Sequence, residues 1–393
     1  MNSQNHILMI TPFFSPNLGG VETHLDDLVT YLTKEGIHVH VVTYHPLTTP
    51  GMKTSFSEHR NRMRIYRVPW VKFNLFYKFE KKPLFQFLYL FPGIFIFSLF
   101  YIAIRYRKIG HIHGHGLAAS VATLVLSKLF RKKSVVSLHT IYKFSERPLL
   151  AAIVRRILMP LDNIFVLAEG CKNDLVKISI PEKKISVYTC WVDNKNTFYQ
   201  RDKKVCRKKM GFPIDKFIVL FVGRLSPEKG VNIVLETARQ ISEQRILFVL
   251  VGDGPMRHEV DFAVSRYGNM TAVGSVPNED LKFYYSAADI LLLGSVDQDY
   301  YGRVTMEALS CGLPVILPNS TAYFGKETMV KIDFPQGEIG FMIPPESKSI
   351  ASLINHLYND SGVPEVMRNN ARSYALEHFS EENANVFTNV YGD

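Results

Sequence analysis

The sequence predicts an α/β protein made of two successive, doubly wound domains. Short apolar runs alternate with amphipathic segments through the first half of the chain, beginning with HILMIT, GGVETHLDDLVTYLTKEG and IHVHVVT. The same alternation starts again after a basic, polar stretch at 197–212. Strands that alternate with helices form a parallel sheet covered on both faces. Each half of the chain is therefore expected to form one such sheet.

In the first half, the segment after HILMIT is expected to form an amphipathic helix that ends near Gly36. At helical spacing its apolar residues share one face, and these are Val21, Leu25, Leu28, Val29 and Leu32. Further strands are expected at 64–68, 109–113, 134–138, 163–167 and 185–188.

In the second half, a helix is expected at VNIVLETARQI and strands at FIVLFVG, ILFVLVG, MTAVGSV, DILLL and LPVIL. We place the domain boundary at the basic stretch, which gives an N-terminal domain of residues 1–200 and a C-terminal domain of residues 201–374. We expect the C-terminal helix, at about 375–393, to cross back onto the first domain.

The composition indicates a globular protein that prefers anionic partners. Of the 393 residues, 47% are hydrophobic and 21% are charged, which is enough apolar surface to bury two cores. The formal net charge is +10, so charge favours nucleotide phosphates, anionic lipids or nucleic acid as partners. The sequence has no recognisable nucleic-acid-binding module, and we expect no nucleic-acid partner.

Cysteine spacing and the N-terminus bear on the compartment. The four cysteines form no CxxC pair, which indicates neither a zinc site nor a disulfide framework. The first residues, MNSQNHILMITPFF, lack the basic start and the cleavage site of a signal peptide. We therefore expect reduced thiols and a cytoplasmic protein.

One segment, 83–104, carries no charge and is long enough to span a membrane. Strand-like runs lie both before and after it, and a segment between strands of one sheet cannot leave for the other side of a bilayer. We expect a buried or membrane-grazing helical segment. The preceding KFNLFYKFEKK alternates lysines with aromatic residues, which indicates peripheral contact with a membrane through 72–104. A solvated basic face is the alternative.

Open α/β sheets bind ligands beyond the carboxyl ends of their strands. In the loop FFSPNLGGVET, Gly19 and Gly20 would let the backbone approach a ligand, and the following helix would offer N–H groups to an anion. A plain turn would show the same two glycines. The loop lacks GxGxxG, so a dinucleotide site is not predicted.

Two further post-strand loops carry candidate binding residues. FVGRLSPEKG supplies Gly223, Arg224 and Lys229, and two cations on one loop can clamp a diphosphate and neutralise charge on a leaving group. A solvated charged loop is the alternative. In VGDGPM, Gly252 suits close approach of a nucleobase or phosphate, although a helix start capped by Asp253 is equally consistent.

Histidines gather at two expected strand ends. HIHGHG supplies His111, His113 and His115, and its glycines indicate that the strand is ending there. No nearby acidic residue or cysteine completes a ligand set, so we expect no metal site. His139, in SLHTIY, stands alone at the start of a loop and is the better candidate, with a purely structural histidine as the alternative.

The stretch DQDYYGRVTMEALSCGLPVI combines a loop, a helix and a strand. Asp299 in the loop and Glu307 in the helix are carboxylates that could hold hydroxyl groups of a polyol ligand. At the helix start, three backbone N–H groups could bind phosphate, and these belong to Gly302, Arg303 and Val304.

Together these motifs resemble the retaining glycosyltransferases of family 4, which have the GT-B fold of two Rossmann-like domains facing across a cleft. The resemblance covers almost the whole chain, from PNLGGVETHLDDLVTYLTKEGIHVHVVT through HIHGHG, SLHT, FVGRLSPEKG and VGDGP to DYYGRVTMEALSCGLPVI. It implies that Glu307 binds the nucleotide ribose and that Asp299 faces the transferred sugar. It also implies that Arg224 and Lys229 bind the donor diphosphate.

The same resemblance places Gly19 and Gly20 near the diphosphate and His139 beside the reacting sugar. Two features depart from the family pattern. Asp299 stands where a glutamate is usual, which shortens the side chain by roughly 1.5 Å and bears on which sugar is held. Residues 190–193 read CWVD where NGVD is usual.

The implied activity is transfer of a hexose from a UDP- or GDP-sugar to a hydroxyl acceptor with retention of configuration. The expected acceptor is a glycolipid, a lipid-linked molecule or a cell-surface glycan precursor, reached at the cytoplasmic face of the membrane. No metal or other cofactor is expected. The alternatives are a nucleotide-sugar epimerase or phosphorylase of the same fold, or a degenerate protein that binds sugar nucleotides without catalysis.

Overall fold

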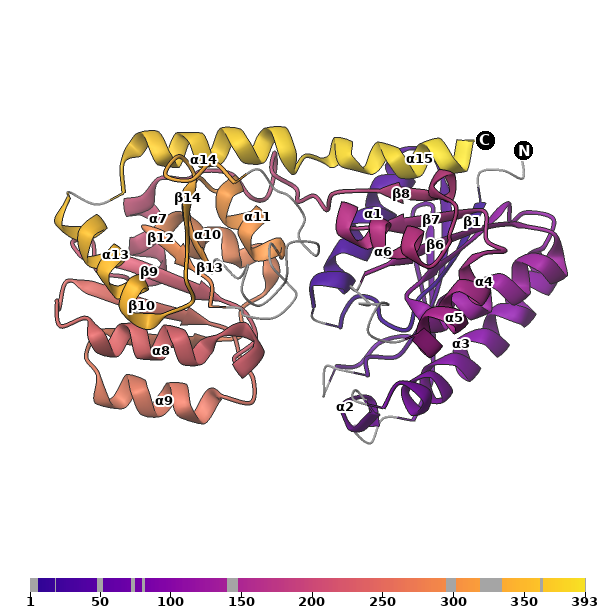
Figure 1. Cartoon of the computed structure of the whole chain (residues 1–393), viewed down its shortest axis with the longest axis horizontal. Helices are drawn as coiled ribbons and strands as arrows, with labels where there is room; N and C mark the ends of the chain where they lie inside the picture. The colour runs from indigo at the N-terminus through magenta and orange to yellow at the C-terminus, as the bar shows by residue number, and fades with distance from the viewer. Residues whose placement is uncertain are drawn as a thin grey trace. The chain divides into compact units, whose positions relative to one another are not determined.

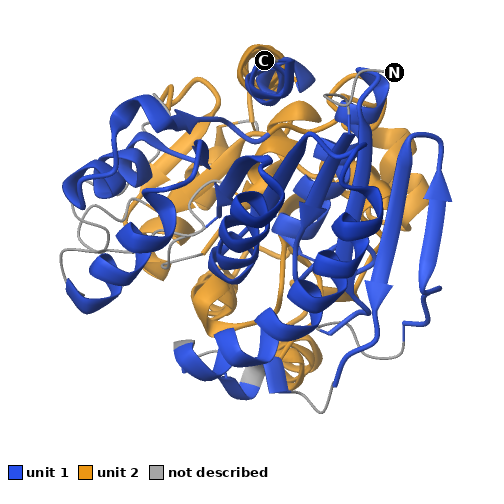
Figure 2. Ribbon diagram, turned by 90° about the vertical axis from the view of Figure 1, so that its right-hand side faces the viewer, with its two compact units in different colours: residues 1–190, 381–393 blue, residues 191–380 orange. Residues whose placement is uncertain are grey.

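The computed structural model describes residues 6–17, 19–47, 52–71, 75–79, 82–139, 148–294, 302–318, 334–360 and 363–392. Their contacts divide the chain into two compact units, which Figure 2 distinguishes by colour. The first unit is Met1–Cys190 together with Glu381–Asp393, and the second is Trp191–Ser380. The end of the chain thus packs with its beginning, whereas residues 191–200 and 375–380 belong to the second unit.

An eight-stranded sheet forms the centre of the first unit, in the order β3-β4-β2-β1-β5-β6-β7-β8. Within it β3 pairs with β4 antiparallel, and the other neighbouring strands pair in parallel. The strands are β1 (His6–Ile10), β2 (His38–Tyr44), β3 (Ser57–Arg60), β4 (Met63–Val68), β5 (His111–His115), β6 (Lys133–Leu138), β7 (Asn163–Val166) and β8 (Ile185–Val187).

Helices cover both faces of this sheet (Figure 1). The described helices are α1 (Gly20–Lys34), α2 (Leu75–Phe79), α3 (Pro83–Arg105), α4 (Leu117–Phe130), α5 (Pro148–Leu158), α6 (Glu169–Lys177) and α15 (Asn385–Gly392). On one face α3, α4 and α5 lie side by side, and α1 and α15 cover the other. The amphipathic pattern of α1 is confirmed by the buried Leu25, Leu28 and Leu32, whereas Val21 in its first turn is exposed.

The second unit contains a six-stranded parallel sheet in the order β11-β10-β9-β12-β13-β14. Its strands are β9 (Phe217–Val222), β10 (Ile246–Val251), β11 (Met270–Gly274), β12 (Ile290–Leu292), β13 (Val315–Pro318) and β14 (Gly340–Ile343). Every residue of β9 and β10 is apolar and buried, as expected of strands that are covered on both faces.

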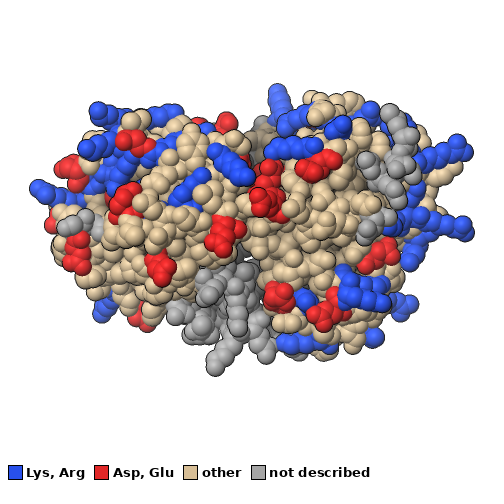
Figure 3. Space-filling view, turned by 90° about the horizontal axis from the view of Figure 1, so that it is seen from above, with Lys and Arg blue, Asp and Glu red and all other residues tan. Residues whose placement is uncertain are grey.

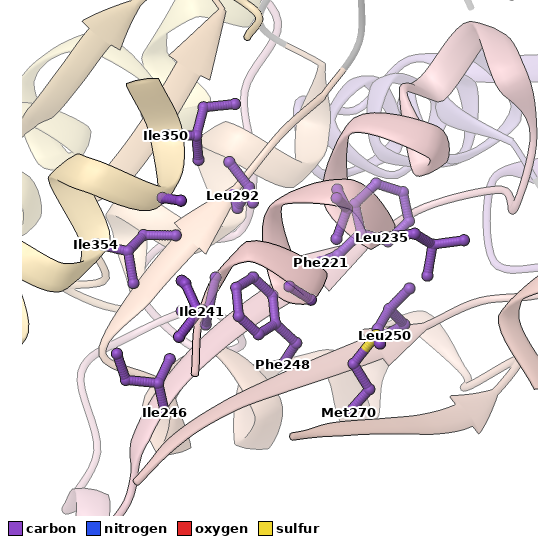
Figure 4. Packing of buried hydrophobic residues seen from close by; sticks show 14 of the residues in the cluster. Phe221, Leu235, Ile241, Ile246, Phe248, Leu250, Met270, Leu292, Ile350 and Ile354 are labelled. Atoms are coloured by element: carbon purple, nitrogen blue, oxygen red, sulfur yellow. The ribbon is translucent and has the colours of Figure 1, made fainter. Parts of the chain in front are cut away.

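The described helices of the second unit are α7 (Lys203–Met210), α8 (Val231–Gln240), α9 (Arg257–Arg266), α10 (Leu281–Ala287), α11 (Arg303–Ser310), α13 (Ser347–Asn359) and α14 (Glu365–His378). One face of the sheet packs against α8, α9 and α13. Figure 4 shows this core, in which Phe221 and Phe248 of the strands lie among Leu235 of α8 and Ile350 and Ile354 of α13. The prediction of two doubly wound α/β domains is confirmed.

In each sheet the chain reverses its direction of strand addition beside one central strand. β1 lies between β2 and β5 in the first unit, and β9 lies between β10 and β12 in the second. Loops that leave two such strands in opposite directions separate at the carboxyl end of the sheet, and ligands of open α/β sheets bind there. Each unit therefore has one place where a ligand site is expected.

Candidate functional site

At the carboxyl end of the second unit's sheet, beside the central strand β9, the loops after β9, β10 and β12 touch through glycines. A Cβ atom added to Gly230 would lie 1.7 Å from the carbonyl oxygen of Gly294. A Cβ atom added to Gly252 would lie 1.9 Å from the carbonyl oxygen of Gly223. Only glycine permits such contacts. Gly252 was predicted to allow close approach of a ligand and Gly223 to belong to the donor site. The structure gives both glycines a further role, because they brace the two loops against each other.

Arg224 and Lys229 lie on the braced loop after β9. Arg224 is exposed and Lys229 is half-buried. Partial burial tends to raise the pKa of Glu228, but hydrogen bonds from its own backbone and from Ser226, with the charges of Arg224 and Lys229, lower it overall. The charges of both predicted cations therefore reach the same small region of the loop, where Glu228 supplies the opposite charge.

Glu307, in α11, is held by three side chains and is 1% exposed. The amide of Asn278 donates to Oε1 at 3.0 Å, and the hydroxyl of Tyr285 donates to Oε2 at 2.9 Å. Nε of Arg303 lies 3.4 Å from Oε1. Such partners compensate a buried carboxylate for the loss of water. Each carboxylate oxygen accepts two hydrogen bonds, so Glu307 keeps accepting capacity for a ligand hydroxyl.

Tyr285 stays protonated as it donates to Glu307. Burial, followed by the charge of Glu307, raises the pKa of Tyr285 well above its ordinary value. Sequence reasoning missed both Tyr285 and Asn278. They precede Glu307 on α10 and in the turn before it, and nothing in their spacing indicates that they meet a carboxylate on another helix.

The start of α11 carries the other predicted donor-binding residues of this unit. Gly302 is exposed and precedes the helix, and Arg303 and Val304 form its first turn. The guanidinium of Arg303 is partly engaged, because one of its Nη atoms donates to the carbonyl oxygen of Trp191 at 3.1 Å. Asp299 lies outside the described residues, so its predicted role stays a prediction.

In the first unit, Gly19 and Gly20 begin α1 after β1, beside the point where β1 and β5 diverge. A Cβ atom at Gly19 would lie 2.3 Å from Oε2 of Glu22, whereas Gly20 has no atom within 4 Å of that position. The backbone at Gly20 is thus open on that side. Burial raises the pKa of Glu22, a residue that sequence reasoning did not single out.

His139 follows β6 and contacts two groups from other elements. Its Nε2 atom lies 3.1 Å from Nδ1 of His115, at the end of β5, and its Nδ1 atom lies 3.4 Å from the hydroxyl of Tyr188. His24 of α1 stacks on Tyr188 and meets His139 edge-on. Burial lowers the pKa of His139 to about 4. Its imidazole is therefore neutral near pH 7.

The strand was expected to end at residue 113, before Gly114 and Gly116, but β5 continues through Gly114 to His115 and ends before Gly116. Gly114 is needed there because a Cβ atom would lie 2.4 Å from Oγ1 of Thr123 and 2.7 Å from the carbonyl oxygen of Ala119, both on α4. His113 faces the other way, where its Nδ1 atom lies 2.6 Å from the hydroxyl of Tyr391. Among the described residues, no group of three or more His, Cys, Asp or Glu is placed to hold a metal ion.

The structure thus brings predicted residues together in the second unit, and in the first unit it adds His24 beside the predicted His139. Gly223, Arg224, Lys229 and Gly252 lie on touching loops of the second unit, where Arg303 and Glu307 also meet each other. In the first unit, His24 of the helix that starts at Gly20 reaches the ring of His139. Each set lies at the carboxyl end of its own sheet.

Two family models match the chain, and between them they cover most of it. The model described as Glycosyltransferase Family 4 matches residues 18–196, and the model described as Glycosyl transferases group 1 matches residues 202–374. Both matches agree with the fold of the unit that they cover.

Relatives of known sequence are distant but extend over most of the chain. A phosphatidylinositol N-acetylglucosaminyltransferase GPI3 subunit of Saccharomyces cerevisiae is 25% identical over 348 residues, which cover 83% of this chain and 72% of the relative. An uncharacterized glycosyltransferase of Methanocaldococcus jannaschii is 24% identical, over 98% of this chain and 97% of the relative.

Solved structures share the fold over nearly the full length. Sucrose-phosphate synthase of Thermosynechococcus elongatus superposes with a TM-score of 0.77 at 21% identity, covering 98% of both chains. HepE of Anabaena, crystallised with UDP, gives a TM-score of 0.73 at 18% identity and also covers 98% of both chains.

Proposed function

The chain belongs to the family 4 glycosyltransferases, which have the GT-B fold, and from this premise we propose that it transfers a hexose from a nucleotide diphosphate sugar to a hydroxyl acceptor with retention of configuration. The observation that carries the proposal is the braced loop that presents Arg224 and Lys229 at the carboxyl end of the second sheet. Cations fixed on a rigid loop suit a departing diphosphate, because they need no reorganisation during reaction.

In this proposal, the donor binds mainly to the second unit. Glu307 accepts hydrogen bonds from the ribose hydroxyls, Arg224 and Lys229 bind the diphosphate, and Asp299 faces the sugar. The complexes of HepE with UDP and with UDP-glucose make a UDP-sugar the first donor to test, with GDP-sugars next. The loop cations and the N–H groups of α11 replace a metal ion in neutralising the leaving group.

None of the site residues stands out as a nucleophile that would form a covalent intermediate. We therefore infer that the acceptor hydroxyl attacks on the face of the sugar from which the diphosphate departs, with the diphosphate as the base. His139, held neutral by burial, contacts the sugar as a hydrogen-bonding group without adding charge beside the leaving anion.

We further propose a lipid-linked acceptor at the cytoplasmic face of a membrane. Several relatives are named as phosphatidylinositol N-acetylglucosaminyltransferase subunits, so their printed acceptor is a lipid. The net charge of +10 also favours an anionic surface.

A thermal-shift screen with UDP-, GDP- and ADP-sugars tests the donor site. A bound donor stabilises the fold by mass action, by about 2.7 kcal/mol at a concentration of one hundred times Kd. Arg224→Ala and Glu307→Gln should each lower the affinity for the donor at least tenfold. Arg239→Ala, an exposed arginine on α8, is the matched control and should leave the affinity unchanged.

Transfer to a lipid acceptor is then measured with the donor that binds. Full activity in both Arg224→Ala and Glu307→Gln would contradict the proposed site. Conversion of the donor without any acceptor would indicate an epimerase. Absence of a shift with every sugar nucleotide would favour a protein that does not use them.

A further inference from the structure

We propose that the outer sides of α3, α4 and α5 form a docking face by which the chain lies flat on an anionic lipid membrane. The docking face would bring the enzyme to the lipid-linked acceptor of the proposed function. The inference rests on that function for the reason why the chain would bind a membrane. The sequence indicated contact through 72–104, of which 72–74 and 80–81 lie outside the described residues. The structure extends the surface to two further helices.

Exposed apolar side chains follow α3 at every fourth residue except at its centre. Their exposed fractions range from 52% at Ile96 to 83% at Ile104, and the row comprises Leu84, Leu88, Ile96, Phe100 and Ile104. Residues four apart in a helix form one ridge. The row is interrupted at Pro92, and a soluble surface rarely exposes apolar rows of this kind unless a partner covers them.

The neighbouring helices continue the apolar surface. Val125 and Leu129 of α4 are 42% and 62% exposed, and Leu149 and Ile153 of α5 are 76% and 51% exposed. Because α3 contacts α4 and α4 contacts α5, the exposed sides of all three helices face away from the same sheet (Figure 1). The docking face is therefore one layer of helices with an apolar outer side.

The charge of this layer identifies its partner as anionic. Residues 82–139 contain eight Lys and Arg and no Asp or Glu, and residues 148–161 contain two Arg and again no acid. On the face of the first unit that carries α15, by contrast, Asp and Glu side chains lie among the Lys and Arg (Figure 3). Apolar side chains flanked only by cations match the acyl chains and head groups of an anionic bilayer.

Basic residues stand at both ends of α3, as interfacial anchors do. Lys82 lies over the ring of Phe85 at 6.0 Å, and Arg105 lies over the ring of Tyr101 at 5.5 Å. Long basic side chains can lay their methylene groups along an apolar surface while the charge reaches the lipid head groups. This arrangement suits a helix that lies in the plane of the membrane.

α3 is long and apolar enough to cross a membrane, but its contacts fix it to the sheet. The hydroxyl of Tyr44, on β2, donates to the carbonyl oxygen of Leu90 at 2.7 Å and accepts from the backbone N–H of Ile94 at 3.0 Å. Those two groups are the i−4 and i partners of an ordinary helix hydrogen bond, so Tyr44 is inserted into α3. Gly93 packs against Tyr44 and Trp70 so closely that a Cβ atom would lie 2.7 Å from Tyr44.

A second copy of the chain fits this face less well than a membrane does. A symmetric dimer would place the same patch of both copies in contact, and two layers that carry only cations would repel each other. A bilayer supplies the opposite charge. We therefore commit to the anionic membrane as the partner.

Co-sedimentation with phosphatidylcholine vesicles, with and without phosphatidylglycerol, tests the docking face. We expect binding that requires phosphatidylglycerol and that weakens from 0.1 M to 1 M salt, as the screening length falls from about 10 Å to about 3 Å. The double variant Phe100→Asp, Ile104→Asp should lower the bound fraction at least tenfold. Phe262→Asp, a 55% exposed residue of the second unit, is the control and should bind as the parent does.

Equal binding of the double variant and the parent, or equal binding to vesicles without phosphatidylglycerol, would overturn the proposal. A dimer in gel filtration that the double variant abolishes would also overturn it. Donor affinity in the double variant should match that of the parent. A parent protein that binds vesicles but no sugar nucleotide would count against the proposed function alone, and a parent protein that binds the donor but no vesicles would count against the docking face alone.

Discussion

Glu307 and His139 are each held by side chains that reach them from other elements. Glu307 accepts hydrogen bonds from Asn278 and Tyr285, which compensate its burial and leave it able to accept more. Burial lowers the pKa of His139 to about 4, and its ring lies beside that of His115. Glu307 is thus a hydrogen-bond acceptor in the second unit, and His139 is a neutral group in the first.

The low pKa of His139 predicts a pH-dependent stability. Its pKa is about 4 in the folded chain against an ordinary 6.5. Between these values the unfolded chain binds a proton that the folded chain does not, so the free energy of unfolding falls as the pH falls from about 6.5 to about 4. His139→Gln should flatten this decline. Urea unfolding at several pH values measures it.

His59→Gln, an exposed position on β3, is the control and should keep the slope of the parent. The slope will not vanish in His139→Gln, because burial also lowers the pKa of His6 to about 4 and that of His40 to about 3. A slope identical to that of the parent would show that His139 titrates normally in the folded chain.

The site residues that the sequence predicted are those that lie in recognisable local motifs. Arg224 and Lys229 flank a loop after an apolar strand, and Glu307 lies in a motif beside the next one. Tyr285 and His24 were missed, because each contacts its partner across two helices or a helix and a loop. Such contacts depend on how helices pack, which no local pattern specifies.

Glycines set the geometry of the loops at the scale of elements. Gly230 has a φ of 70° and meets Gly294, while Gly223 meets Gly252, so the loops after three parallel strands are locked by backbone contacts. Rigid loops hold Arg224 and Lys229 in place without a ligand, which reduces the ordering that donor binding would require.

Gly230→Ala should therefore damage both the fold and the donor site. The added Cβ atom would lie 1.7 Å from a backbone oxygen, and the positive φ adds strain of about 1–3 kcal/mol for a residue other than glycine. We expect a lower melting temperature and at least a tenfold loss of donor affinity, because Lys229 precedes Gly230 directly. Thermal melts and donor titrations measure the two effects.

Gly268→Ala is the matched control in the same unit, since its Cβ atom would make an ordinary contact of 3.6 Å with the side chain of Gln244. Unchanged donor affinity in Gly230→Ala would show that the contact with Gly294 does not position the loop cations.

Long apolar strands were predictable, whereas two short edge strands, β3 and β14, were not. β9 and β10 are continuous apolar runs because both of their faces are buried. β3, with the sequence SEHR, was not predicted, since it is a largely exposed antiparallel strand at the sheet edge and has no buried face to pattern it. The end of β5 was misplaced because Gly114 was read as a strand end, whereas it makes room for α4.

At the scale of the whole molecule, the chain forms the first unit, then the second, and returns to the first with its C-terminal residues. The returning residues are well anchored. Tyr31 donates to the side chain of Asn385 at 2.5 Å, and Tyr391 lies 2.6 Å from His113. The proposed docking face lies on the opposite side of the same sheet. The first unit would therefore bind the returning C-terminal residues on one face and the membrane on the other.

Phe387→Ala should destabilise the first unit selectively. Phe387 is fully buried, and its ring centroid lies 4.3 Å from that of Phe165 and 4.9 Å from that of Tyr188. Removing a buried phenylalanine costs about 3–5 kcal/mol. Asn389→Ala, an exposed position on the same helix, is the control and should change little.

The two tryptophans allow each unit to be followed separately, because Trp70 lies in the first and Trp191 in the second. In a Trp191→Phe background, Phe387→Ala should lower the urea midpoint reported by Trp70 fluorescence. In a Trp70→Phe background, it should leave the midpoint reported by Trp191 in place. Equal shifts of both midpoints would mean that the units unfold as one, and an unchanged Trp70 midpoint would mean that the returning helix contributes little to the first unit.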